Sequence, residues 1–172
     1  MNFFVVGLPR SRTAWLANFL TYEHHCYHEG MNGCQSIADY RNKLGNDKGD
    51  ASTALMLIDL NAMFPKAPVV IIDSDIKRSI QYAYDTFHYY NPAYFRYLKD
   101  RLKKIKGLHI AFEEIDDCLE IIWKTLMNTP FNNERAELLK QMKIEVKNPW
   151  IYDTQIANEL LPKETAWPLQ SH

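Results

Sequence analysis

The residues best suited to chemistry lie in a short loop near the N-terminus, Gly7-Leu8-Pro9-Arg10-Ser11-Arg12-Thr13. Gly7 permits a tight turn, because glycine has no side chain to restrict its backbone. Arg10 and Arg12 carry forked donors that suit phosphate or sulfate oxygens. The hydroxyls of Ser11 and Thr13 add further hydrogen bonds. Together these residue types predict a binding site for an oxyanion.

The elements on either side of this loop would place it correctly for that purpose. Residues 3–6 form an apolar, β-prone run, and residues 14–22 show helical spacing, with Trp15 and Phe19 four residues apart. The first turn of a helix leaves backbone N–H groups without intrahelical partners, and these attract anions. The simpler alternative is a connecting loop with solvated arginines.

Strand and helix signals alternate along the rest of the chain. Strands are predicted at 24–28, 69–72 and 108–112, and residues 44–52 are predicted to form a loop by their composition. Helices are predicted at 35–43, 52–64, 76–87, 94–106, 117–127 and 134–142. This alternation indicates an α/β fold, a three-layer sandwich around a mostly parallel sheet. We expect a single domain over residues 1–172, with an irregular C-terminal tail from about residue 147.

Composition excludes several classes of protein. The 172 residues include 20 basic and 21 acidic side chains, for a net charge of -1. This balance argues against nucleic-acid binding through bulk charge. No apolar run reaches the length of a membrane span, and the N-terminus does not resemble a signal peptide. Three cysteines without a CxxC pair fit reduced thiols, so a cytoplasmic location is expected.

The loop is not a Walker A motif. Counted from Gly7, that motif requires Gly, Lys and Ser or Thr at positions that here hold Arg12, Thr13 and Ala14. An ordinary ATPase or kinase is therefore disfavoured.

The loop does resemble the 5′-phosphosulfate-binding loop of the sulfotransferase family, G-x-P-[RK]-S-G-T-T-W-L. Residues 7–16 match seven of its nine specified positions. The resemblance continues weakly at His28-Glu29-Gly30, at residues 45–50 and at residues 69–82. It implies a short, divergent sulfotransferase with a P-loop NTPase-like fold. The implied donor is 3′-phosphoadenosine 5′-phosphosulfate (PAPS), and the implied acceptor is a small molecule with a hydroxyl or amine.

The resemblance also assigns roles within the loop. Arg10 would contact the sulfuryl group and the leaving phosphate, a role that needs no metal because a fixed cation stabilises the developing charge. The remaining residues implied to bind the donor at this loop are Gly7, Pro9, Ser11, Arg12, Thr13 and Ala14. A hydroxyl acceptor also needs a base, and we expect His28 or Glu29, at the end of the second predicted strand, to serve. The choice between them stays open, as does the reading of both as ordinary strand-end residues.

Two departures from the family pattern concern the donor. Arg12 replaces the loop glycine, which is costly if that position needs a positive φ. The family usually binds the 3′-phosphate with an Arg and a Ser, where this chain has Asp73 and Gln81. Lys77, Arg78 and Ser79 are the available substitutes, and we expect Arg78 to bridge Asp73 and the phosphate. The alternative is a degenerate nucleotide- or anion-binding protein without transfer.

Three other patterns have ordinary explanations. His24, Cys26 and His28 would share one face of a strand, but their spacing is not typical of zinc sites. The aromatic-rich stretch 82–97 fits a core, or the face of a homodimer, better than a platform for stacking a ligand ring. The basic run 96–106 is typical of a solvated helix face.

Overall fold

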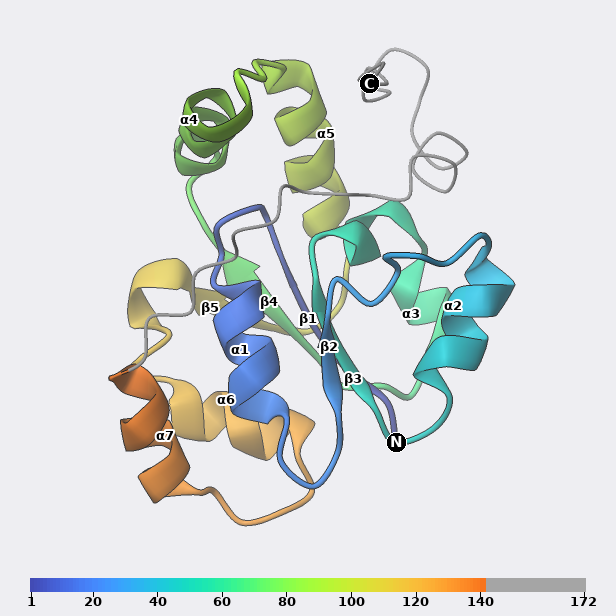
Figure 1. The fold of residues 1–172 in the computed structure, drawn as a ribbon, viewed down its shortest axis with the longest axis vertical. Helices are drawn as coiled ribbons and strands as arrows, with labels where there is room; N and C mark the ends of the chain where they lie inside the picture. Colours follow the sequence, from blue (N-terminus) through green and yellow to red (C-terminus); the bar gives the residue numbers. More distant parts are fainter. Residues whose placement is uncertain (142–172) are drawn as a thin grey trace.

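The computed structural model describes residues 1–141 and contains one five-stranded, all-parallel sheet (Figure 1). The spatial order of the strands is β2-β3-β1-β4-β5. The strands are β1 (Phe3–Gly7), β2 (Cys26–His28), β3 (Gly49–Ser52), β4 (Val69–Asp73) and β5 (Leu108–Ala111). The predicted α/β class with a parallel sheet is confirmed.

Helices cover both faces of the sheet and complete three layers. The α-helices are α1 (Thr13–Leu20), α2 (Ile37–Leu44), α3 (Leu60–Met63), α4 (Ile76–Phe87), α5 (Pro92–Leu102), α6 (Leu119–Leu126) and α7 (Asn133–Lys140). Two 3-10 turns are η1 (Ala54–Leu57) and η2 (Phe112–Glu114). Side chains from α1, α6 and α7 form the core on one face, whereas α2, α3, η1 and α5 contribute to the core on the other.

Alternation along the two central strands divides their side chains between these cores. In β1, Phe4 and Val6 belong to one core, while Phe3 and Val5 belong to the other. All of β1 is buried, as expected for a central parallel strand that has helices on both sides. The continuous apolar run at 3–6 therefore predicted its strand correctly.

Strand β3 was missed, because residues 44–52 were predicted to be a loop. Gly49–Ser52 consists of small and polar residues, yet all four are buried between β1 and β2. With no apolar run, nothing in its sequence marks it as a strand. Because β3 lies between them, β2 is not adjacent to β1 in the sheet.

Side-chain caps explain some of the helix boundaries. The predicted helix 52–64 is instead η1 followed by α3, which begins where Asp59 accepts a hydrogen bond from the Ala62 N–H. Helix α5 begins earlier than predicted, because Asn91 caps it and Pro92 occupies its first turn. It ends at Leu102 rather than at Lys106.

The basic run on α5 is not simply a solvated face, so that prediction is wrong in part. The Arg101 guanidinium donates to the backbone carbonyls of Met56 and Ile58 at 2.9 and 3.0 Å. Lys99 also has partners, at the end of β4. Both side chains tie α5 to the rest of the fold.

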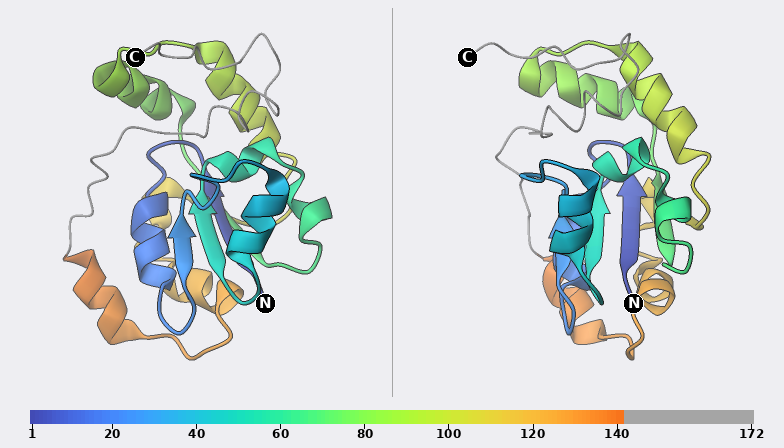
Figure 2. Two further views of the ribbon diagram at one scale, coloured as in Figure 1. Left: turned by 45° about the vertical axis from the view of Figure 1, so that its right-hand side comes forward. Right: turned by 90° about the vertical axis from the view of Figure 1, so that its right-hand side faces the viewer.

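Helices α4 and α5 lie beyond the carboxyl ends of the strands, whereas α7 lies near the opposite end (Figure 2). This places α4 and α5 beside the edge where ligands bind in open parallel sheets. No helix in residues 1–141 is long and apolar enough to cross a bilayer. The irregular tail predicted from about residue 147 lies outside the described residues.

Gly107, just before β5, packs closely against the backbone of β4. A Cβ at this position would lie 2.5 Å from the backbone oxygen of Val69 in β4. We predict that Gly107→Ala lowers the free energy of unfolding by about 1–3 kcal/mol, because the backbone must shift. Lys104→Ala on the exposed surface nearby should change it by less than about 0.5 kcal/mol. Denaturant unfolding of both variants checks this, and equal stability of the two would contradict it.

Candidate functional site

The loop between β1 and α1 sits where the carboxyl ends of β1 and β4 meet. A Cβ on Gly7 would lie 2.8 Å from the Cβ of Ser11, so the loop curls tightly over the end of its own strand. Ser11 is fully buried, and its Oγ lies 2.9 Å from that of Ser74, just after β4. The hydroxyl of Ser79 donates to the Pro9 carbonyl at 2.7 Å. The floor of the loop is thus fixed by hydrogen bonds to the β4–α4 segment.

Both arginines of the loop adopt left-handed backbone conformations, with φ of 70° at Arg10 and 61° at Arg12. For a residue other than glycine, this conformation costs about 1–2 kcal/mol. Among residues 1–141, five residues other than glycine have positive φ, and three of these are Arg10, Arg12 and Glu29. Such concentration of strain is typical of functional sites.

Each arginine also has a partner within the protein. The Arg10 guanidinium lies over the ring of Tyr82 in α4, 4.4 Å from its centroid. Arg12 donates to Asp116 at 2.9 Å, and its guanidinium lies over the ring of Trp15. Arg10 is exposed and held by an aromatic contact, whereas Arg12 is held by an ion pair as well. Arg10 could therefore turn toward a ligand and lose fewer contacts than Arg12 would.

Helix α1 begins directly after these arginines. The Leu16 N–H bonds to the Arg12 carbonyl as the first bond of the helix. The N–H groups of Thr13, Ala14 and Trp15 precede that bond, so they have no partner within the helix. They supply donors and a partial positive charge at the mouth of the loop.

Although β3 separates β2 from β1, the structure brings His28 to the loop. Its Nε2 lies 3.4 Å from the Thr13 hydroxyl and 3.9 Å from the Glu29 carboxylate. Burial lowers the pKa of His28 below its ordinary value, and the charge of Glu29 partly opposes this. The imidazole is therefore held neutral near pH 7, the form that can accept a proton.

Both carboxylate oxygens of Glu29 accept hydrogen bonds from within the protein. One carboxylate oxygen accepts from the Ser52 hydroxyl at 2.7 Å, and the other accepts from the Thr53 N–H at 3.0 Å. The residue is only 8% exposed. Between the two predicted bases, the geometry favours His28 as the accessible one, with Glu29 beside it.

A second carboxylate, Asp50 of β3, supports the turn that follows Glu29. It is fully buried and accepts hydrogen bonds from the Gly30 N–H at 3.0 Å and the Tyr40 hydroxyl at 2.8 Å. Burial raises the pKa of Asp50 to about 7, and the charge of Glu29 adds to this while the Gly30 bond opposes it. Sequence reasoning missed Asp50 because its strand was missed.

The end of β4 differs from the predicted arrangement. The Asp73 carboxylate accepts from His109 Nδ1 at 2.7 Å and from Lys99 Nζ at 3.4 Å. The expected contact between Arg78 and Asp73 is not formed, and a contact of Arg78 with a phosphate stays a prediction. The Arg78 guanidinium instead lies over the ring of Phe112, 3.7 Å from its centroid, and near Glu113.

The structure therefore gathers the loop and His28, but turns Arg78 elsewhere and uses Ser79 to hold the loop. Gln81 donates to Asp85 on the exposed side of α4. Whether the predicted residues contact a ligand stays a prediction. The aromatic stretch is partly core, since Tyr94 and Phe95 are buried, and partly a support for Arg10 through Tyr82. No group of three His, Cys, Asp or Glu side chains within residues 1–141 could hold a metal ion.

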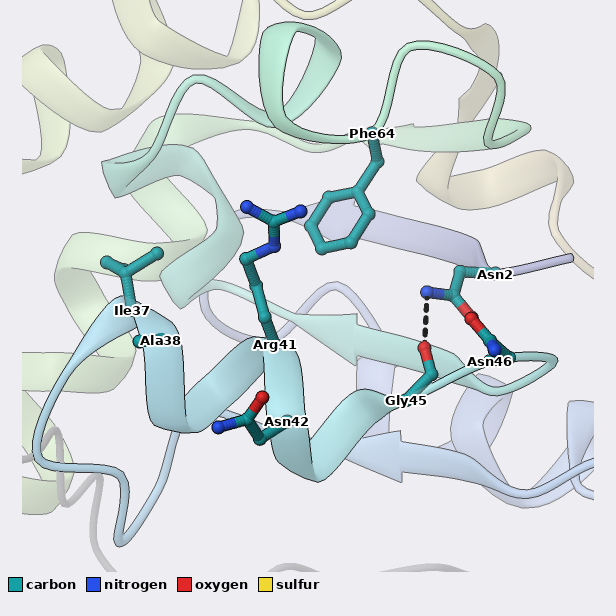
Figure 3. Close-up of a pocket in the computed structure, with 8 residues that line it drawn as sticks. All are labelled: Asn2, Ile37, Ala38, Arg41, Asn42, Gly45, Asn46 and Phe64. Carbon is teal, nitrogen blue, oxygen red and sulfur yellow. Dashed lines mark hydrogen bonds between the residues drawn. The ribbon is translucent and has the colours of Figure 1, made fainter.

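A pocket of about 720 Å³ lies apart from this site, near the N-terminus of β1 (Figure 3). It lies between α2 and Phe64, and the guanidinium of Arg41 points toward the Phe64 ring. Its other lining residues include Asn2, Asn42 and Asn46. None of the predicted site residues lines it.

Comparison with known proteins supports the fold. No protein-family model and no curated protein sequence matches this chain. Among solved structures, it is similar to the crystal structure of mouse sulfotransferase SULT7A1 complexed with PAP (3′-phosphoadenosine 5′-phosphate), with a TM-score of 0.53 and 15% sequence identity. The match covers 81% of this chain but 63% of the sulfotransferase chain. The two proteins thus share a distant sulfotransferase-like fold, and this chain spans less than two thirds of its neighbour.

Asp50 should make stability depend on pH. Its pKa is raised from 3.8 in the unfolded chain to about 7 in the fold, so the folded state retains the proton longer. The stabilisation is present below pH 4 and is lost as pH rises through 7, with about 2–3 kcal/mol of it lost between pH 5 and pH 8. We predict that Asp50→Asn, which cannot ionise, lacks this decline. Chemical denaturation across the pH range checks it, and identical slopes for both proteins would contradict the assignment.

Proposed function

We propose that this protein is a sulfotransferase-like enzyme that binds the 5′-phosphosulfate group of a nucleotide at the β1–α1 loop. The observation that carries the proposal is the curled loop itself, in which Gly7 and Ser11 touch and Arg10 stands beside the first turn of α1. Fold similarity to a sulfotransferase complexed with PAP supports the same class of ligand.

The residues present fit the 5′ end of the implied donor, PAPS. The N–H groups of Thr13, Ala14 and Trp15 would bind phosphate oxygens, with the Thr13 hydroxyl beside them. Arg10 would move from the Tyr82 ring to the transferring group and add a charge-assisted contact. The residues at the end of β4 do not fit a 3′-phosphate, because Asp73 places a carboxylate there. The proposal therefore covers binding of the 5′-phosphosulfate group of PAPS and does not extend to its 3′-phosphate.

The reaction transfers one sulfuryl group from the donor phosphate to the acceptor. The acceptor oxygen forms a new bond to sulfur as the bond between sulfur and the bridging phosphate oxygen breaks, and the nucleotide leaves as its 5′-phosphate. His28 takes the proton of the acceptor hydroxyl. Arg10 and the α1 N–H groups stabilise the charge that develops on the leaving oxygen. Glu29 stabilises the imidazolium formed on His28.

An alternative function is nucleotide or anion binding without transfer. The carboxylate of Asp73 at the expected 3′-phosphate position favours it, because a PAPS-dependent enzyme would have a cation there. Under either function, three expectations from the sequence remain proposals: a small-molecule acceptor or ligand, a homodimer and a cytoplasmic location.

Arg10 should carry a large share of ligand affinity. We predict that Arg10→Ala weakens binding of adenosine 5′-monophosphate (AMP) about ten- to a hundredfold, because a charge-assisted contact is lost. Arg96 is exposed on α5, so Arg96→Ala should change affinity less than about twofold. Calorimetric titration measures both. Equal affinity of Arg10→Ala and the wild type would remove Arg10 from the site.

Transfer and binding can be separated at His28. We predict that His28→Ala lowers turnover about a hundredfold or more while leaving nucleotide affinity within about threefold, since His28 acts on the acceptor. Turnover is followed in the forward direction, with adenosine 5′-phosphosulfate or PAPS as donor and a phenol as acceptor, by the formation of the aryl sulfate. Nucleotide binding without turnover in the wild type would favour the alternative function, and wild-type turnover in His28→Ala would exclude His28 as the base.

A further inference from the structure

We propose that Asp73 selects a donor nucleotide with a free 3′-hydroxyl, such as adenosine 5′-phosphosulfate, over one with a 3′-phosphate. This inference rests on the proposed function and names the substrate class for the same site. It arises from the Asp73 carboxylate at the end of β4. Neither phosphosulfate binding by the loop nor proton transfer by His28 requires this group.

Asp73 lies close to the loop in the fold. It is the last residue of β4, the strand next to β1, and it directly precedes Ser74. Ser74 Oγ is 2.9 Å from Ser11 Oγ within the loop. A nucleotide with its 5′ group in the loop would therefore bring its ribose to the same edge of the sheet. The sulfotransferase resemblance places the donor's 3′ position at the residue that Asp73 occupies.

The surroundings keep Asp73 in place as an acceptor. His109 of β5 and Lys99 of α5 hold its two oxygens, and Lys99 Nζ also lies 3.3 Å from the Ser74 carbonyl. The Asp73 side chain is still 41% exposed, so a ligand can reach it. The carboxylate is thus fixed by two different elements and has room for another donor.

The charges around Asp73 do not suit a phosphate dianion. Lys99 is already paired with the carboxylate, and Arg78 is turned toward Phe112 and Glu113. A 3′-phosphate would meet a fixed negative charge, and like charges at short range repel strongly. A ribose hydroxyl would instead donate to the carboxylate, as acidic residues do in dinucleotide sites that bind an unphosphorylated ribose, where an arginine accommodates the phosphorylated one.

Calorimetric titration with AMP and PAP tests this, because the two nucleotides differ only in the 3′-phosphate. The wild type should bind AMP about tenfold more tightly than PAP. Asp73→Arg should reverse that order, since it replaces the carboxylate with a cation. Asp73→Asn keeps the size of the side chain but removes its charge, so the ratio should fall toward one. Glu137→Arg on α7 makes the same charge change near the opposite end of the sheet, and should leave the ratio unchanged.

The outcomes distinguish this inference from the proposed function. PAP binding as tight as AMP or tighter in the wild type would overturn the selectivity and leave the loop site standing. An unchanged ratio in Asp73→Asn would also overturn it, and this variant covers the case in which Asp73→Arg fails to fold. If the wild type binds neither nucleotide, the proposed function itself fails, and the inference fails with it.

Discussion

The close approach of the β1–α1 loop to the end of its own strand determines most of the site. Because Gly7 lacks a side chain, Ser11 can pack against it and reach Ser74, while Ser79 holds the Pro9 carbonyl from α4. The curl forces Arg10 and Arg12 into left-handed conformations. Hydrogen bonds from Ser74 and Ser79, both in the β4–α4 segment, therefore compensate for backbone strain at the point where α1 begins.

Behind the loop, a buried acidic network sets the position of the base. Asp50 holds the Gly30 N–H and Tyr40, and Ser52 with Thr53 holds Glu29, all within or next to β3. His28 then lies between this network and Thr13. Helix α1 packs against both β2 and β3, so His28 at the end of β2 lies within reach of Thr13 although β2 is two strands away from β1.

Sequence alone predicted the parts of the fold that have apolar runs or regular spacing. The runs at 3–6 and 69–72 and the helix at 76–87 are in place, and the pattern of residues 7–16 identified the loop. It could not reveal β3, because Gly49–Ser52 is buried only through its neighbours. Nor could it find the Asp73 contacts, since Lys99 and His109 are 26 and 36 residues away in sequence. Long-range polar pairing depends on tertiary position and leaves no local pattern.

The proposed function depends on binding of the 5′ group of a nucleotide at the β1–α1 loop. A crystal structure of the protein grown with saturating AMP tests it most directly. We expect the 5′-phosphate within hydrogen-bonding distance of the Thr13 and Ala14 N–H groups, with the Arg10 guanidinium moved from Tyr82 to the phosphate. A phosphate bound elsewhere, for example beside Arg41 in the pocket of Figure 3, with Arg10 still on Tyr82, would contradict it.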